Sequence, residues 1–96
     1  MPAAARKGDS GVVHCSGFNI ASGSGDVFIN GQSAARKGDT SSAHKRPGSP
    51  CPTHTSSIAG GSSSVFINGQ AAARVGDAFA GCTSVSSGSG DVFIGG

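Results

Sequence analysis

Three side chains that commonly bind metal ions occur at one fixed distance from a repeated Gly-Asp pair. His14, His44 and Cys82 each lie five residues after the Asp of such a pair. Imidazole and thiolate groups are the usual ligands of zinc in proteins. If the three segments surround a common axis, residues at equivalent positions form a ring. We therefore predict that these three side chains converge on one metal ion.

A tetrahedral zinc ion needs a fourth ligand, and the longest loop, residues 40–64, contains two further candidates, Cys51 and His54. We favour His54, because the extra length of this loop is then explained by the ligand that it carries, and Cys51 remains the alternative. Four protein ligands close the coordination sphere, so the predicted role of the metal is structural. The predicted site is one Zn²⁺ ion bound by His14, His44, His54 and Cys82.

The other reactive residues give no sign of an enzyme. The chain has no Glu, the usual general base of a zinc hydrolase, and no nucleophile motif around any Ser. Cys15 has no counterpart in the other loops and is expected to be a small buried residue or a spectator thiol. Asp26 and Asp91 are predicted turn residues. Three further Asp recur three positions after an Arg and are predicted to form structural pairs, namely Arg6–Asp9, Arg36–Asp39 and Arg74–Asp77.

The elements that position these residues are copies of one sequence. Residues 27–39, VFINGQSAARKGD, return almost unchanged as residues 65–77, VFINGQAAARVGD. A third copy is divided between the ends of the chain, with AAARKGD at residues 3–9 and DVFIGG at residues 91–96. We therefore predict one domain, residues 1–96, made of three pseudo-equivalent units around an axis. The units are 27–64, 65–91, and 92–96 joined to 1–26.

Each copy has the pattern of a β-hairpin. Val-Phe-Ile favours a strand, Asn-Gly is the strongest short signal for a hairpin turn, and the following Gln-Ser/Ala-Ala-Ala-Arg is the expected returning strand. The alternation of a strand places Phe28 on the face opposite Val27 and Ile29. With 17 Gly, five Phe and no Trp or Tyr, the chain has little bulk for a conventional core. We predict an all-β fold with thin walls, supplemented by a metal.

Charge and hydropathy exclude several classes of partner. A formal net charge of +2 is too small to indicate a nucleic-acid surface, and the paired basic residues are expected to be solvated. No apolar run approaches the roughly 20 residues needed to span a bilayer, and the N-terminus lacks the apolar core of a signal peptide. We expect a protein made in the cytoplasm with no nucleic-acid partner.

The repeats Ala34–Asp39 and Ala72–Asp77, each preceded by Val-Phe-Ile-Asn-Gly-Gln, resemble the PAAR-repeat family over essentially the whole chain. The proline of the family name is replaced by Ala3, Ser33 and Ala71. The resemblance implies a small conical, pseudo-threefold β domain with a zinc site near its apex. It also implies a position on the blunt end of a trimeric β-helical spike, either VgrG-type in type VI secretion or in a phage tail. The base is expected to be built from the VFING and AAR residues.

The resemblance implies a non-enzymatic function. We expect a zinc-stabilised tip that caps the spike, one tip per trimer, and helps to pierce a target membrane, with which its contact is transient. It would be delivered outside the cell or into the target cell, or would form a virion tail tip. The printed chain leaves no room for a toxic extension, so a bare tip is expected. The alternative is an adaptor that docks effectors or a cell-surface component through the middle loop, with Lys45 and Arg46 as contacts.

Overall fold

The described part of the chain is all-β, as predicted. The computed structural model describes residues 2–12, 17–42, 44–45, 53–80 and 83–95, and these contain no helix. They form three antiparallel pairs, β1 with β2, β3 with β4 and β5 with β6. Every strand is two residues long: β1 is Phe28–Ile29, β2 Gln32–Ser33, β3 His44–Lys45, β4 Thr53–His54, β5 Phe66–Ile67 and β6 Gln70–Ala71.

Two of these pairs are the hairpins that the Asn-Gly dipeptides predict. Asn30 and Gly31 have φ of 55° and 78°, and Asn68 and Gly69 have φ of 54° and 79°. Positive φ at both central residues defines the two-residue turn whose twist matches that of the flanking strands. Ile29 therefore pairs with Gln32, and the same register recurs between β5 and β6.

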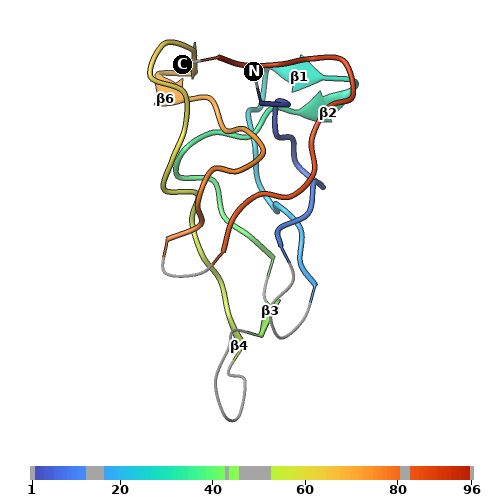
Figure 1. The fold of residues 1–96 in the computed structure, drawn as a ribbon, viewed down its shortest axis with the longest axis vertical. Helices are drawn as coiled ribbons and strands as arrows, with labels where there is room; N and C mark the ends of the chain where they lie inside the picture. Colours follow the sequence, from blue (N-terminus) through green and yellow to red (C-terminus); the bar gives the residue numbers. More distant parts are fainter. Residues whose placement is uncertain (1, 13–16, 43, 46–52, 81–82, 96) are drawn as a thin grey trace.

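The two ends of the chain form a third arm of the same kind. Ala3 pairs with Phe93 in an antiparallel bridge, at the position that Ser33 and Phe28 occupy in the first hairpin. The amide of Ile94 donates to the carbonyl of Pro2 at 2.9 Å. Both chain ends accordingly lie beside β1, β2 and β6, at the broad end of the molecule (Figure 1).

The returning strands are shorter than expected. We predicted that they would continue through the Ala-Ala-Arg segment, but β2 ends at Ser33 and β6 at Ala71. The residues that follow leave their own hairpin and pair with a neighbouring repeat instead. These pairs are the bridges Arg6↔Ala34, Arg36↔Ala72 and Ala4↔Arg74.

A closed ring of backbone hydrogen bonds joins the three repeats. The amide of Ala5 donates to the carbonyl of Ala73 at 3.0 Å, Ala73 donates to Ala35 at 3.1 Å, and Ala35 donates back to Ala5 at 3.0 Å. All three side chains are buried. A larger side chain would hold the backbones apart, so Ala permits this approach around the axis.

The core lies in two layers on either side of this ring. Towards the broad end, three Ala pack with three Ile, and these are Ala4, Ala34, Ala72, Ile29, Ile67 and Ile94. On the other side the ring alanines pack with Ile20, Ile58, Val85, Phe18 and Phe79. The two Phe rings meet edge to face, with centroids 5.2 Å apart. The molecule extends 38 × 24 × 23 Å and narrows from its broad end towards β3 and β4 (Figure 1).

Candidate functional site

The broad end of the molecule carries an exposed apolar surface that is repeated three times. Phe28, Phe66 and Phe93 are 59%, 60% and 50% exposed, and the Val before each of them is more than one-third exposed. Large apolar side chains that gather on one face of a soluble domain mark an interaction surface. We call this surface the base, and it consists of Val27, Phe28, Val65, Phe66, Val92 and Phe93.

Two sequence expectations for the base need correction. Phe28 and Ile29 alternate between outside and inside as predicted, but Val27 is exposed, because the strand begins only at Phe28 and the alternation does not reach Val27. The AAR segment was expected to contribute to the base. Its alanines, such as Ala34 and Ala35, are instead buried, because they form the ring and the core layer beneath it.

Each repeat contains an Arg-Asp ion pair beside the base, as the spacing of the two residues predicted. In the first repeat, Asp9 accepts from the backbone amide of Arg6 at 2.7 Å, from its Nε at 2.9 Å and from its Nη2 at 3.0 Å. Asp9 is buried, so the ion pair and these hydrogen bonds offset the cost of removing its carboxylate from water. The same bonds recur in Arg36–Asp39 and Arg74–Asp77.

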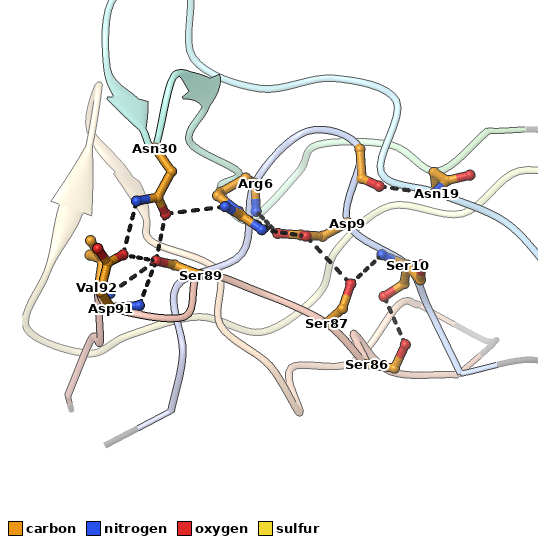
Figure 2. Close-up of polar contacts among 11 residues, drawn as sticks. Arg6, Asp9, Ser10, Asn19, Asn30, Ser86, Ser87, Ser89, Asp91 and Val92 are labelled. Carbon is orange, nitrogen blue, oxygen red and sulfur yellow. Dashed lines mark hydrogen bonds and ion pairs between the residues drawn. The ribbon is translucent and has the colours of Figure 1, made fainter.

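The Arg-Asp pair continues into a polar network that reaches another repeat (Figure 2). Arg6 Nη1 donates to Asn30 Oδ1 at 3.1 Å, and Asn30 Nδ2 donates to Asp91 Oδ1 at 2.9 Å. The hydroxyl of Ser89 lies 2.6 Å from Asn30 Oδ1 and accepts the backbone amide of Val92 at 2.9 Å. The hydrogen bond from Asn30 and then that from Ser89 lower the pKa of Asp91. We call this set the first corner: Arg6, Asp9, Asn30, Ser89 and Asp91.

The second corner repeats the first, whereas the third corner is reduced. The second corner consists of Arg36, Asp39, Asn68, Ser24 and Asp26 and has the same bonds. In the third corner Gly95 stands in place of the Asn, and Ser64 in place of the second Asp. There, Arg74 Nη1 donates to the Gly95 carbonyl at 3.3 Å, and Ser62 Oγ donates to the same carbonyl at 2.6 Å. The third corner thus lacks both the Asn and the Asp that bind each other in the other two corners.

The three corners also contain buried serines that were not predicted from the sequence, namely Ser24, Ser62 and Ser89. Each hydroxyl accepts the backbone amide of the Val that opens the next hairpin. A sequence signal for these serines exists, because similar segments, SGSGD, GGSSS and SGSGD, precede the three Val-Phe-Ile segments. A residue that hydrogen-bonds its own backbone a few positions ahead is typical of such turns.

The narrow end brings two of the predicted zinc ligands to opposed positions. In the pairing of β3 with β4, His44 is the direct partner of His54, and no pattern in the sequence predicted this strand pair. Residues opposite each other in an antiparallel pair lie at the shortest cross-strand separation. The other two predicted ligands, His14 and Cys82, lie outside the described residues, as do Cys51 and Cys15. Within the described ranges no three His, Cys, Asp or Glu residues form a group that could hold a metal ion.

The architecture and the two ends define a threefold β domain with an exposed apolar base. The model of the PAAR motif family matches residues 2–44 and 48–96 of the chain. The protein therefore belongs to the PAAR motif family, whose members are structural proteins associated with the spike tips of contractile injection machines. No curated protein sequence gives a significant match. The described residues also contain no helix long and apolar enough to cross a membrane.

Proposed function

We propose that this protein caps the end of a trimeric β-helical spike through its base and forms the sharp tip that helps to pierce the target membrane. The observation that carries the proposal is the threefold repetition of exposed Val-Phe pairs at one end of the molecule. Three copies in one chain present the same apolar side chains to three neighbours at once. A trimer with a threefold axis offers three such neighbours.

The physical need for a cap comes from the partner. The open end of a β-helix exposes unpaired strand edges and the apolar interior, which are prone to association. The Val and Phe side chains of the base would cover that interior. Burying them removes apolar surface from water, which favours association by roughly 25 cal/mol for each Å². One tip for each trimer is the expected stoichiometry.

The narrow end would be held by the metal. His14, His44, His54 and Cys82 fit a zinc ion in the chemistry of their donor atoms, and the opposed backbone positions of His44 and His54 support the choice of His54. A bound zinc would supply a crosslink between loops of different repeats. This would stiffen the end of the molecule that lies away from the base and would first meet the membrane.

The test of the base is a triple variant, Phe28→Ser with Phe66→Ser and Phe93→Ser. We expect it to fold, because these rings are exposed, and to lose binding to trimeric spike proteins from the same source in sedimentation experiments. Val12→Ser is the matched control, since Val12 is 45% exposed but does not belong to the base. Full binding by the folded triple variant would exclude the base as the docking surface.

The test of the metal is the zinc absorption edge of the protein as purified. We expect one sulfur at about 2.3 Å and three nitrogens at about 2.0 Å. His54→Ala would then replace one nitrogen, whereas Cys51→Ser would change nothing. Two sulfurs would show that Cys51 is a ligand, and a bound water would contradict a structural site.

A further inference from the structure

A polar hollow of about 270 Å³ lies beside the base in the second repeat. It is formed between the segment that follows the alanine ring and the turn that joins β5 to β6. The hollow is lined by Arg36, Lys37, Gly38, Asp39, Asn68 and Gln70. Asn68 and Gln70 flank the tip of the hairpin whose Val65 and Phe66 belong to the base, so the hollow opens at the rim of the proposed docking surface.

The residues that line the hollow carry a net positive charge, and the balancing negative charge is that of Asp26, which lies outside the lining and accepts a hydrogen bond from Asn68. Asp39 is neutralised by Arg36, which binds it through the backbone amide, Nε and Nη2. Arg36 Nη1 donates to Asn68, which leaves one N–H on each terminal nitrogen, because a guanidinium has five. Lys37 is exposed and forms no ion pair with any described residue. The lining side chains therefore sum to one positive charge with unused donors.

The corresponding place in the first repeat is more crowded. The Oε1 atom of Gln32 lies 3.7 Å from where a Cβ on Gly8 would be, whereas nothing lies within 4 Å of that point on Gly38. In addition, Asn19 Nδ2 donates to the carbonyl of Gly8 at 2.8 Å. The equivalent of Asn19 in the second repeat is Ser57, whose short side chain makes no such bond to Gly38.

The third repeat lacks the chemistry of the hollow. Val75 replaces the lysine, Gly95 the asparagine and Pro2 the glutamine. Among the described residues, the second repeat thus combines the lysine, the asparagine and the uncrowded glycine beside its Arg-Asp pair.

We propose that this hollow binds a carboxylate, the side chain of an Asp or Glu on the docked spike. A carboxylate matches the single net charge, and its two oxygens can accept from the free guanidinium N–H groups and from the ammonium of Lys37. The choice of the spike as the source rests on the proposed function, because the hollow lies at the rim of the base. A symmetric trimer presents three identical acidic side chains, of which this tip would bind one.

The carboxylate site is tested without the spike. Sodium acetate is titrated into ¹⁵N-labelled protein, with sodium chloride at equal concentration as reference. We expect saturable shifts of the Lys37 and Gly38 amides with acetate, and none in Lys37→Val, which copies the third repeat. Lys7→Val is the matched control and should leave these shifts unchanged. Shifts that do not saturate, or equal shifts at Lys7 and Gly8, would overturn the site.

The source of the carboxylate is tested with the trimeric spike. Lys37→Val should weaken binding by about two- to fivefold, the range of an exposed ion pair, while Lys7→Val should bind as the wild type does. Equal binding by the two variants would show that the spike does not fill the hollow. Failure of the base would appear separately, as full spike binding by the Phe-to-Ser triple variant, and would leave the acetate result unaffected.

Discussion

In the core layer on the side of the alanine ring away from the base, the three repeats carry different side chains at equivalent positions. The base, in contrast, has the same Val-Phe pair in each repeat. In this layer Phe18 lies over Gly11 in the first repeat. In the third repeat the backbone amide of Phe79 donates to the carbonyl of Thr83. The middle repeat has two serines there, Ser41 and Ser56. Two large rings and one pair of small side chains fill the same layer. The side chains that fill this layer therefore differ from repeat to repeat.

Gly11 allows Phe18 to occupy its place. A Cβ at Gly11 would lie 2.0 Å from Cζ of Phe18, so Gly11→Ala must displace the ring and should lower the free energy of unfolding by about 1–3 kcal/mol. Gly25→Ala is the control, because nothing lies within 4 Å of its Cβ position. Urea denaturation measures both variants, and equal stabilities would contradict this packing.

Asn30 should set the acidity of Asp91 without affecting Asp26. The hydrogen bond from Asn30 is the largest cause of the lowered pKa of Asp91, so Asn30→Ala should raise that pKa towards the ordinary value of 3.8. Carboxyl ¹³C shifts against pH report each Asp, and Asp26 should not change because Asn68 binds it. An unchanged pKa of Asp91 would argue against the network of the first corner.

The same pKa shifts give the direction of the acid response. Asp26 and Asp91 have a lower pKa in the folded state than their ordinary value. Their contribution to stability is therefore present above pH 3.8 and is lost as the pH falls through the folded pKa values. Thermal melts should show a steeper loss below pH 3.8 in the wild type than in Asn30→Ala. Parallel melting curves would indicate that the network adds nothing to stability.

At the level of elements, none of the hairpins in the described part of the chain has enough contacts to be stable alone. Each strand has two residues, and an isolated two-stranded hairpin is marginal in water even when it is longer. Stability must come from the ring of Ala5, Ala35 and Ala73 and from the core layers that it joins. The repeats should therefore fold and unfold together.

Hydrogen exchange tests this cooperativity. The amides of Ala5, Ala35 and Ala73 each donate to another repeat, so they should exchange with one common free energy, equal to that of global unfolding. Ala35→Val overpacks the axis and should lower all three protection factors by the same factor. A separate, lower value for any one of these amides would show that its repeat opens alone.

The sequence predicted the features that depend on residues close together in the chain, and it did not predict those that depend on contacts between distant repeats. The Asn-Gly turns follow from the backbone preferences of two adjacent residues, and the Arg6–Asp9 pair from a spacing of three. The alanine ring depends on hydrogen bonds between repeats far apart in the chain, so the Ala-Ala-Arg segment was assigned to a longer strand. The strand pair containing His44 and His54 was missed because no periodic pattern marks it. The four-residue zinc site stays a prediction.

For the whole molecule, the charges beside the base cancel repeat by repeat. In the first repeat the positive charges of Arg6 and Lys7 are matched in number by Asp9 and Asp91, and the second repeat carries an equivalent set. Where the third repeat loses its lysine to Val75, it also loses an aspartate to Ser64. The formal charges of each repeat beside the base thus sum to zero when Asp26 and Asp91 are counted, although the residues that line the hollow are cationic. The base itself is apolar.

This balance predicts that the proposed binding to a spike depends only weakly on salt. Apolar burial is not screened by ions, and neutral rims release few counterions. Calorimetry at low and at physiological salt should give affinities within a few-fold of each other, together with a negative change in heat capacity. A steep loss of affinity with salt would show that charge dominates docking.

The ring of three alanine hydrogen bonds also has a mechanical consequence. Each repeat is held to both of its neighbours at the same height in the molecule, so a push along the axis strains the three bonds simultaneously rather than one after another. Links stretched in parallel share a force, whereas links in series each feel all of it. Under a load along the axis, the domain should therefore resist up to a high force and then unfold in one cooperative step, rather than repeat by repeat.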